Sequence, residues 1–213
     1  MDKRTILVFG AHPDDVEIGM GGTIRRLAVT HNTVISCVAS VPNQIVIRKR
    51  ESREAAKILT VKKTIFLDIP VNALGFNRKT IGAIDSVINV CKPASVFTHW
   101  IGDSHQDHVN LTHSVLAAAR HNHFNVFMYE QTVPGGITHA SFRPQLFIDI
   151  STEIEEKMKS INAHQSQCKK YGNAWADGIR GRAMHRGLQI RVPFAEAFEI
   201  VKVKDDTSFF HFT

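Results

Sequence analysis

The sequence predicts an α/β fold that is Rossmann-like, with three layers and a mostly parallel central sheet. Apolar runs rich in Val, Ile and Phe recur along the chain, and stretches with apolar residues at helical spacing lie between them. Strands and helices that alternate in this way form βαβ units with right-handed crossovers. The apolar runs are also nearly continuous, which is typical of a sheet covered on both faces.

Each element follows from its own stretch of sequence. Strands are predicted at about residues 4–10, 33–39, 64–69, 95–99, 125–130 and 145–150. Helices are predicted at about residues 16–31, 44–60, 80–91 and 108–120. The last third of the chain departs from this alternation, with a loop at 133–137, a long polar helix at 151–171, an Arg- and Gly-rich stretch without a clear period at 174–195, and a final strand at 197–203.

Composition indicates a globular protein. The 213 residues, of which 43% are hydrophobic, are enough for one well-buried core, so we expect a single domain over residues 1–213. Three widely spaced cysteines without a CxxC pair predict neither a disulfide framework nor a thiolate zinc site. The sequence shows no signal-like segment and no apolar run of membrane-spanning length, so we expect a cytoplasmic protein without stable membrane association.

The formal net charge of +6 raises the question of nucleic-acid binding. The densest basic cluster is Arg48, Lys49, Arg50 and Arg53. No RNP-like, zinc-finger or helix-turn-helix signature accompanies this charge, so we do not expect a nucleic-acid partner. Attraction of an anionic small molecule, such as a phosphorylated sugar, is the better explanation of the positive field.

The first candidate site is the segment Ala-His-Pro-Asp-Asp at 11–15, between the first predicted strand and the first predicted helix. Loops at the carboxyl edge of an open α/β sheet are where ligands and catalytic groups gather. His12 together with one of the two aspartates, Asp14 or Asp15, could hold a divalent metal, and the other carboxylate would then be left for chemistry. The alternative is a simple turn and helix start, which Pro and Asp also favour.

The second candidate site is His-Gln-Asp-His at 105–108, which follows the predicted strand at 95–99 and a short loop. It falls at the same edge of the predicted sheet, so the two motifs are expected to meet in space. Three histidine and aspartate ligands with one position left to water are typical of catalytic zinc, whereas a structural site has four protein ligands, usually including sulfur.

The two motifs resemble those of the PIG-L/LmbE-like zinc-dependent N-deacetylases. The resemblance rests first on Ala-His-Pro-Asp-Asp-Val-Glu with the glycine-rich residues 18–23 behind it, and on the later His-Gln-Asp-His. Further agreement comes from Arg48, Glu51 and Ala55, from His-Gln-Ser-Gln at 164–167, and from Ala-Glu-Ala-Phe at 195–198. The resemblance extends from about residue 5 to about residue 200.

The resemblance implies that His12, Asp15 and His108 bind one zinc ion per chain and that Asp14 is the general base. Another divalent metal would suit the same ligands. Zinc lowers the pKa of bound water, and a nearby carboxylate can then take the proton.

The remaining site residues follow from the same chemistry. His105 would stabilise the oxyanion, with Asp107 holding its other ring nitrogen and favouring the imidazolium. The resemblance to the family further implies that Arg48 contacts a sugar hydroxyl near the amide.

The implied substrate is a small molecule with an N-acetylglucosaminyl-type group. The alternative is a Rossmann-like nucleotide-binding or metal-binding protein without deacetylase turnover, although the glycines at 10–22 do not follow GxGxxG and two acids would repel a pyrophosphate. The sequence leaves the oligomeric state open, a homo-oligomer included.

Several nearby residues have two interpretations each. His164 and Gln167 fall on one helix face, so they could line the pocket or cap a neighbouring loop. Asp103 could shape the loop before His105 or touch the substrate. Glu17 is not expected to be a metal ligand.

Overall fold

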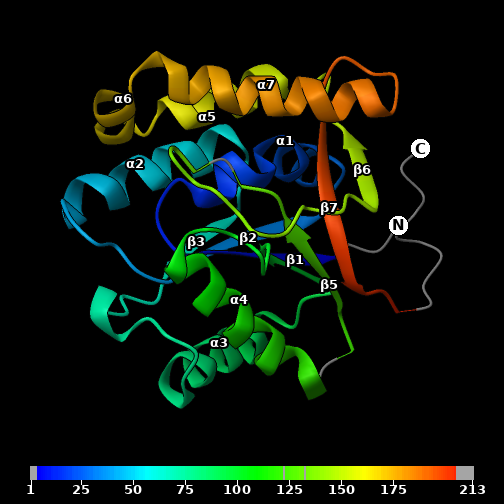
Figure 1. The fold of residues 1–213 in the computed structure, drawn as a ribbon. Coiled ribbons are helices and arrows are strands. Elements are labelled where there is room, and N and C mark those ends of the chain that lie inside the picture. Colours follow the sequence, from blue (N-terminus) through cyan, green and yellow to red (C-terminus); the bar gives the residue numbers. More distant parts are fainter. Residues whose placement is uncertain (1–3, 122, 132, 205–213) are drawn as a thin grey trace.

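The computed structural model describes residues 4–121, 123–131 and 133–204. Seven strands form one sheet in the order β3-β2-β1-β4-β5-β7-β6 (Figure 1). Their bounds are β1 Thr5–Gly10, β2 Thr33–Val38, β3 Lys63–Phe66, β4 Ser95–His99, β5 Asn125–Tyr129, β6 Leu146–Asp149 and β7 Ala195–Lys202.

The helices and the two 3-10 turns connect these strands. Their bounds are α1 Asp15–Val29, α2 Ile45–Ile58, η1 Val71–Ala73, α3 Arg78–Cys91, α4 Gln106–Ala118, η2 Ala119–His121, α5 Ile154–Asn162, α6 Gln165–Tyr171 and α7 Asn173–Gln189. Among the residues the structure describes, no helix has both the length and the apolar character needed to cross a bilayer.

The predicted fold class is confirmed. β1 pairs in parallel with β2 and β4, and the pairs β2–β3 and β4–β5 are also parallel. The C-terminal strand β7 runs antiparallel to both of its neighbours, β5 and β6. The sheet is therefore mostly parallel, with a mixed edge.

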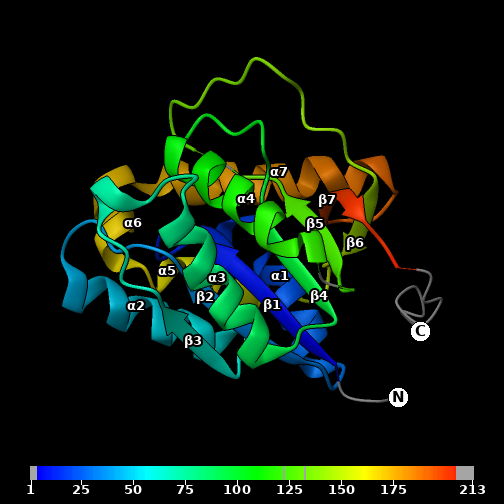
Figure 2. The same cartoon turned by 90° about the horizontal axis from the view of Figure 1, so that it is seen from below.

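Alternating residues of β1 show how the sheet is covered on both faces. Ile6 and Val8 belong to a core shared with α1, α5 and α7. Leu7 and Phe9, which point to the other face, belong to a core shared with α3 and α4. Figure 1 shows α1, α5 and α7 stacked above the sheet, and Figure 2 shows α3 and α4 across its other face. This arrangement gives the three layers and buries β1 almost completely.

The structure differs from the sequence prediction in the last third of the chain. The single helix expected at 151–171 is wrong, because α5 ends at Asn162 and α6 begins at Gln165. Between them His164 has φ −81° and ψ 61°, outside the helical region. The Glu51 side chain on α2 accepts hydrogen bonds from the Ser166 amide (2.8 Å) and hydroxyl (2.6 Å). A side chain from another helix therefore pairs with a backbone amide at the start of α6, which has no partner within the helix. The undefined stretch at 174–195 is mostly helix, in α7.

The position of β1 decides where the two polar motifs lie. β1 is flanked by β2 on one side and by β4 on the other, so the chain turns in opposite directions after these neighbouring strands. A crevice forms outside the carboxyl ends of the strands at such a switch point. The β1–α1 loop and the β4–α4 loop, which carry the two motifs, both enter it.

Candidate metal centre and substrate cleft

The structure brings the two predicted motifs into direct contact. His12 Nε2 from the first lies 3.0 Å from Asp107 Oδ2 of the second. Asp15 Oδ1 lies 3.4 Å from His108 Nε2. All four residues are nearly or fully buried. The carboxyl edge of neighbouring parallel strands therefore joins them into one site.

The first motif occupies a tight turn between β1 and α1. Asp14 has φ 99° and ψ −26°, a left-handed conformation that is uncommon for a residue with a side chain. Asp15 Oδ2 accepts a hydrogen bond from the His12 amide at 2.7 Å, which closes the turn. Strained backbone of this kind persists where surrounding contacts enforce it, often at functional sites.

The second motif is built as an ordinary helix start. His105 is the N-cap of α4, and its Nδ1 accepts a hydrogen bond from the Asp107 amide at 3.1 Å. Asp103 Oδ1 accepts from the His105 amide at 2.9 Å. This half of the site thus follows from local capping.

Three side chains present donor atoms that suit a divalent metal. His12 Nδ1 lies 3.7 Å from Asp15 Oδ2, and His108 Nε2 lies 3.4 Å from Asp15 Oδ1. The other ring nitrogen of each histidine meets a carboxylate: Asp107 for His12 at 3.0 Å and Asp103 for His108 at 2.8 Å. Metal-binding histidines almost always have such a partner, which fixes the ring and its tautomer. The residues present therefore fit the metal that the resemblance implies.

Two other groups of donor atoms overlap with this set. His12, His105 and His108 form one, and Asp15, His99 and His108 form the other, with the donor atoms of each lying within 4.8 Å of one another. His108 belongs to both groups and to the set that the resemblance implies. His99 Nε2 is 3.2 Å from Asp15 Oδ2 and 3.0 Å from the Ala11 amide, close to both partners.

The electrostatic balance also favours a cation. Burial by itself would lower the pKa of His108, but the carboxylates of Asp15 and Asp103 raise it to about 10. Burial opposes ionisation of Asp15, yet His108 and His99 hold the pKa of Asp15 well below its ordinary value. Negative charge is therefore maintained around His108, as a metal site requires.

Asp14 stands apart from these ligands. Burial and the neighbouring Asp15 carboxylate raise the pKa of Asp14 to about 6. The Arg48 guanidinium partly opposes this shift, since Arg48 Nη2 lies 3.4 Å from Asp14 Oδ1. A carboxylate whose pKa is near neutrality can both accept and return a proton.

Arg48 has a structural contact beside its predicted role. Arg48 Nη2 donates a 2.8 Å hydrogen bond to the Pro13 carbonyl, so it supports the first loop as well as lining the cleft. It is only 5% exposed. Any substrate contact of Arg48 would therefore be combined with support of the Asp14 turn.

Two expectations about His105 and Asp107 need correction. The Asp107 carboxylate contacts His12 instead of holding His105, because residues two apart at a helix start do not face each other. Burial, with His108 and His12, lowers the pKa of His105, so the imidazolium is not favoured. Since Nδ1 accepts the Asp107 amide, the neutral ring carries its proton on Nε2.

Sequence reasoning missed or left open four buried groups around the site. Asp103 supports His108, and His99 packs its ring against His108 with centroids 3.8 Å apart. His164 is fully buried with Nε2 3.5 Å from Glu17 Oε2, so it does not line the pocket. Because Asp103 and His99 flank the second motif, their position at the strand end was the signal that could have identified them.

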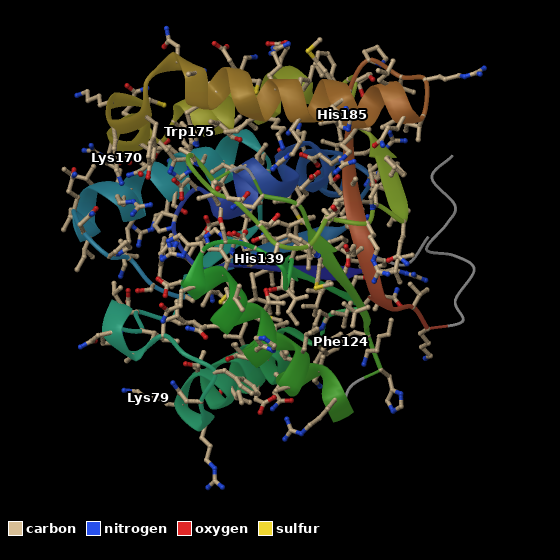
Figure 3. All side chains as sticks on the ribbon, viewed as in Figure 1. Lys79, Phe124, His139, Lys170, Trp175 and His185 are labelled. Atoms are coloured by element: carbon tan, nitrogen blue, oxygen red, sulfur yellow. The ribbon has the colours of Figure 1, made fainter. Side chains whose placement is uncertain are left out.

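The candidate metal ligands line a cleft of about 510 Å³. Other residues that line this cleft come from α6 and α7, namely Gln167, Lys170, Tyr171 and Trp175. Figure 3 labels Lys170 and Trp175 at this end of the molecule. The size of the cleft is ordinary for a small-molecule site.

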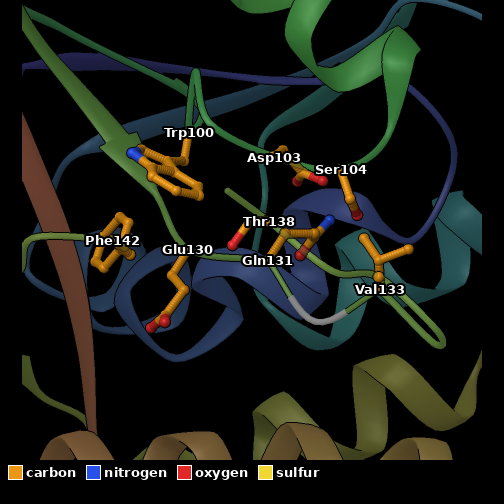
Figure 4. A pocket seen from close by; sticks show the side chains of 9 residues that line it. Trp100, Asp103, Ser104, Glu130, Gln131, Val133, Thr138 and Phe142 are labelled. Carbon is orange, nitrogen blue, oxygen red and sulfur yellow. The ribbon is translucent and has the colours of Figure 1, made fainter. Parts of the chain in front are cut away.

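A second pocket of about 210 Å³ adjoins the cleft, and Gln131 and Val133 line both (Figure 4). Its charged side chains already have partners. Asp103 meets His108, and Glu130 pairs with Arg186 through two contacts of 2.6 and 2.8 Å. This pocket therefore offers no free charge of its own, and chemistry belongs to the larger cleft.

Comparison with known proteins identifies a family and relatives for this chain. The PIG-L family, described as GlcNAc-PI de-N-acetylase, matches residues 7–119. The uncharacterized deacetylase YaiS of Escherichia coli K12 is 31% identical over 175 residues, which cover 77% of this chain and 92% of YaiS. The diacetylchitobiose deacetylase of Thermococcus kodakarensis is 25% identical over 224 residues, covering 94% of this chain and 84% of that enzyme.

A solved structure shares the fold. The N,N'-diacetylchitobiose deacetylase of Pyrococcus horikoshii, in complex with its inhibitor MPG, aligns with a TM-score of 0.79 at 25% identity. The alignment covers 100% of this chain and 87% of that one. The family match spans both motifs of the site, over more than half of the sequence. The chain therefore belongs to the PIG-L family of deacetylases.

Proposed function

We propose that this protein is a zinc-dependent hydrolase that removes the acetyl group from a small N-acetyl amino sugar. One observation carries the proposal. Asp14, a buried carboxylate whose pKa is raised to about 6, lines the same cleft as His12 and His108, and each of these histidines has one ring nitrogen held by a carboxylate, Asp107 for His12 and Asp103 for His108. The names of the two diacetylchitobiose deacetylases support an acetylated sugar as the substrate class.

His12, Asp15 and His108 would hold the zinc ion. Zinc, when bound, supplies a Lewis acid that activates water and polarises the acetyl carbonyl. Asp103 and Asp107 keep the two histidines in the tautomer that leaves Nε2 of His108 and Nδ1 of His12 free to bind a cation.

Asp14 handles the protons of the hydrolysis. Its carboxylate takes one proton from the attacking water while the water oxygen bonds to the acetyl carbon. As the carbon–nitrogen bond breaks, Asp14 returns that proton to the departing nitrogen. The free amine and acetic acid are released, and the acid gives the second proton of the water to solvent as it becomes acetate. A pKa close to neutral pH suits both transfers.

His105 would stabilise the developing oxyanion as a neutral hydrogen-bond donor. Its Nδ1 is occupied by the Asp107 amide, which leaves Nε2–H on a ring that lines the cleft. A fixed donor aimed at developing charge in a buried site contributes strongly to catalysis. Positive charge on the ring is not needed for this role.

The direct test is release of free amine from a panel of N-acetylated compounds, with and without a chelator. The panel includes N-acetylglucosamine, its 1- and 6-phosphates and diacetylchitobiose, with N-acetylglycine as the non-sugar amide. We expect chelator-sensitive, zinc-restored activity on at least one sugar. Zinc binding without amine release from any sugar would favour the alternative, a metal-binding protein without turnover.

A further inference from the structure

Helix α1 is broken one turn after the metal-site loop. Met20 has φ −147° and ψ 30°, which divides the helix into residues 15–19 and residues 21–29. The first segment carries Asp15 and ends beside Ile18, whose side chain lines the cleft. The second segment packs along the sheet. The angle between the two segments therefore decides where Asp15 lies.

Close packing leaves the break little freedom. A Cβ added to Gly19 would lie 2.2 Å from the Tyr129 ring, and one added to Gly22 would lie 2.7 Å from the Ile150 side chain. The glycines on both sides of Met20 thus let the backbone approach β5 and residue 150 more closely than any other residue would.

Buried side chains satisfy the backbone groups at the break. In an unbroken helix the Ile18 carbonyl would accept from the Gly22 amide. Here the Ile18 carbonyl accepts from Lys157 Nζ at 2.8 Å and from Arg182 Nη2 at 2.6 Å. The Glu196 carboxylate accepts from the Gly22 amide at 3.0 Å and the Thr23 amide at 2.7 Å.

These partners come from three elements that follow the metal motifs in sequence. Lys157 is on α5, Arg182 on α7 and Glu196 on β7, and Figure 1 shows α5 and α7 stacked over α1. Lys157 and Glu196 also bond directly to each other, with side chains that are 0% and 3% exposed. Both oxygens of Glu196 and the amine of Lys157 are thereby committed to the break and to each other.

A buried ion pair of this kind contributes little net stability compared with apolar residues of similar size, because both charges lose their hydration. Its effect here is geometric. It holds a carbonyl and two amides that lie on opposite sides of Met20, and so fixes the two segments of α1 relative to each other.

We propose that Lys157 and Glu196 are positioning residues for the metal site: by holding the break at Met20, they keep Asp15 opposite His108. The inference rests on the proposed function only in taking Asp15 and His108 as metal ligands. Ile18 and Asp15 belong to the same helical turn, so movement of the Ile18 carbonyl would move the Asp15 carboxylate with it.

The test compares metal binding in folded variants. Lys157→Met, Glu196→Gln and the double variant would be measured for Zn²⁺ affinity by chelator competition and for the visible spectrum of the Co²⁺-loaded protein. Lys159→Met is the matched control, because it makes the same change at an exposed position of the same helix. Ile84→Ala, which opens a cavity on the far face of the sheet, controls for lower thermal stability.

We expect Zn²⁺ affinity to fall on the order of tenfold in the Lys157 and Glu196 variants, because residues that hold a metal ligand in place typically have effects of this size. The Co²⁺ spectrum of these variants should also change. Both controls should bind Zn²⁺ as the wild type does, even where Ile84→Ala lowers Tm. If Lys157→Met and Glu196→Gln do not fold, Arg182→Gln removes one bond to the Ile18 carbonyl and must show a smaller change of the same kind.

If folded Lys157→Met and Glu196→Gln proteins keep the wild-type Zn²⁺ affinity and Co²⁺ spectrum, the inference is overturned and the proposed function is unaffected. An equal loss of affinity in Ile84→Ala would also overturn it, since general destabilisation would then explain the effect. Conversely, a wild-type protein that binds metal but releases no amine would overturn the proposed function alone, because the readouts here do not depend on turnover.

Discussion

The two loops that form the candidate metal site are stabilised in different ways. The β4–α4 loop is a regular helix start, capped by His105 and closed by Asp103. The β1–α1 loop is strained at Asp14, and the helix behind it is broken at Met20. The β4–α4 loop is thus stabilised by its own local hydrogen bonds, whereas the β1–α1 loop depends on residues elsewhere in the chain.

This difference separates the tasks of the two loops. Because the start of α4 is capped, the position of His108 is fixed by its own helix. The strained loop places two adjacent carboxylates in different environments, with the pKa of Asp15 held low by His108 and His99 and the pKa of Asp14 raised to about 6 by burial and by Asp15. One aspartate can then bind a cation while its neighbour exchanges protons.

The largest expected effect comes from removing one ligand from each loop. Asp15→Ala and His108→Ala should each lose zinc and, with it, measurable deacetylation, because each leaves only two of the three protein ligands. Metal analysis of the purified variants, beside their circular dichroism, checks this. Full zinc occupancy in Asp15→Ala would mean that the overlapping set of His12, His105 and His108 binds the ion. Full occupancy in His108→Ala would contradict every one of these donor sets, since all of them include His108.

Asp14→Asn should separate chemistry from metal binding within the strained loop. The amide cannot take a proton from water, so we expect kcat to fall by roughly 10² to 10⁴ while zinc remains bound. Steady-state kinetics and zinc content of the same preparation provide the measurement. Loss of zinc together with activity would place Asp14 among the ligands.

The carboxylates that contact the two histidines, Asp103 and Asp107, allow the effect of one supporting residue to be compared between the two loops. Asp103→Asn acts on His108 within its own loop, whereas Asp107→Asn acts across the site on His12. Each should weaken zinc affinity by about 10- to 100-fold, which is typical when a residue that hydrogen-bonds to a metal ligand is replaced. Chelator competition measures both, and Ser104→Ala in the same loop is the control. An unchanged affinity in Asp107→Asn would remove its assigned support of His12.

The smallest effect concerns the strain itself. Asp14→Gly and Asp14→Ala both remove the carboxylate, but only glycine relieves the left-handed φ of 99°. We expect the glycine variant to be more stable than the alanine variant by about 1 kcal/mol in chemical denaturation. Equal stability of the two would show that the turn is not strained. Both should be inactive.

The fold class and the proximity of the two motifs could both be predicted from the sequence. The alternation of apolar runs predicted the strands near their observed bounds, and the edge rule for parallel strands placed His12 next to the 105–108 motif. Both inferences depend on local pattern and on the chirality of βαβ units. They need no knowledge of side-chain contacts.

The details of the site could not be predicted because they depend on contacts between distant segments. Asp107 supports His12, a pairing across 95 positions that no local pattern shows. The separation of α5 from α6 depends on Glu51, far away on α2. The break in α1 depends likewise on Lys157 and Glu196, which lie far along the chain.

The place of β7 in the sheet has a consequence for how the protein becomes active. It is the last strand in the described chain, yet it lies between β5 and β6 in the interior of the sheet. On synthesis from the N-terminus, β1 and the histidine motifs are made long before β7 inserts and delivers Glu196 to α1. Pairings between such distant segments form slowly. If Glu196 positions Asp15 as proposed, the site is complete only after nearly the whole described chain has been synthesised.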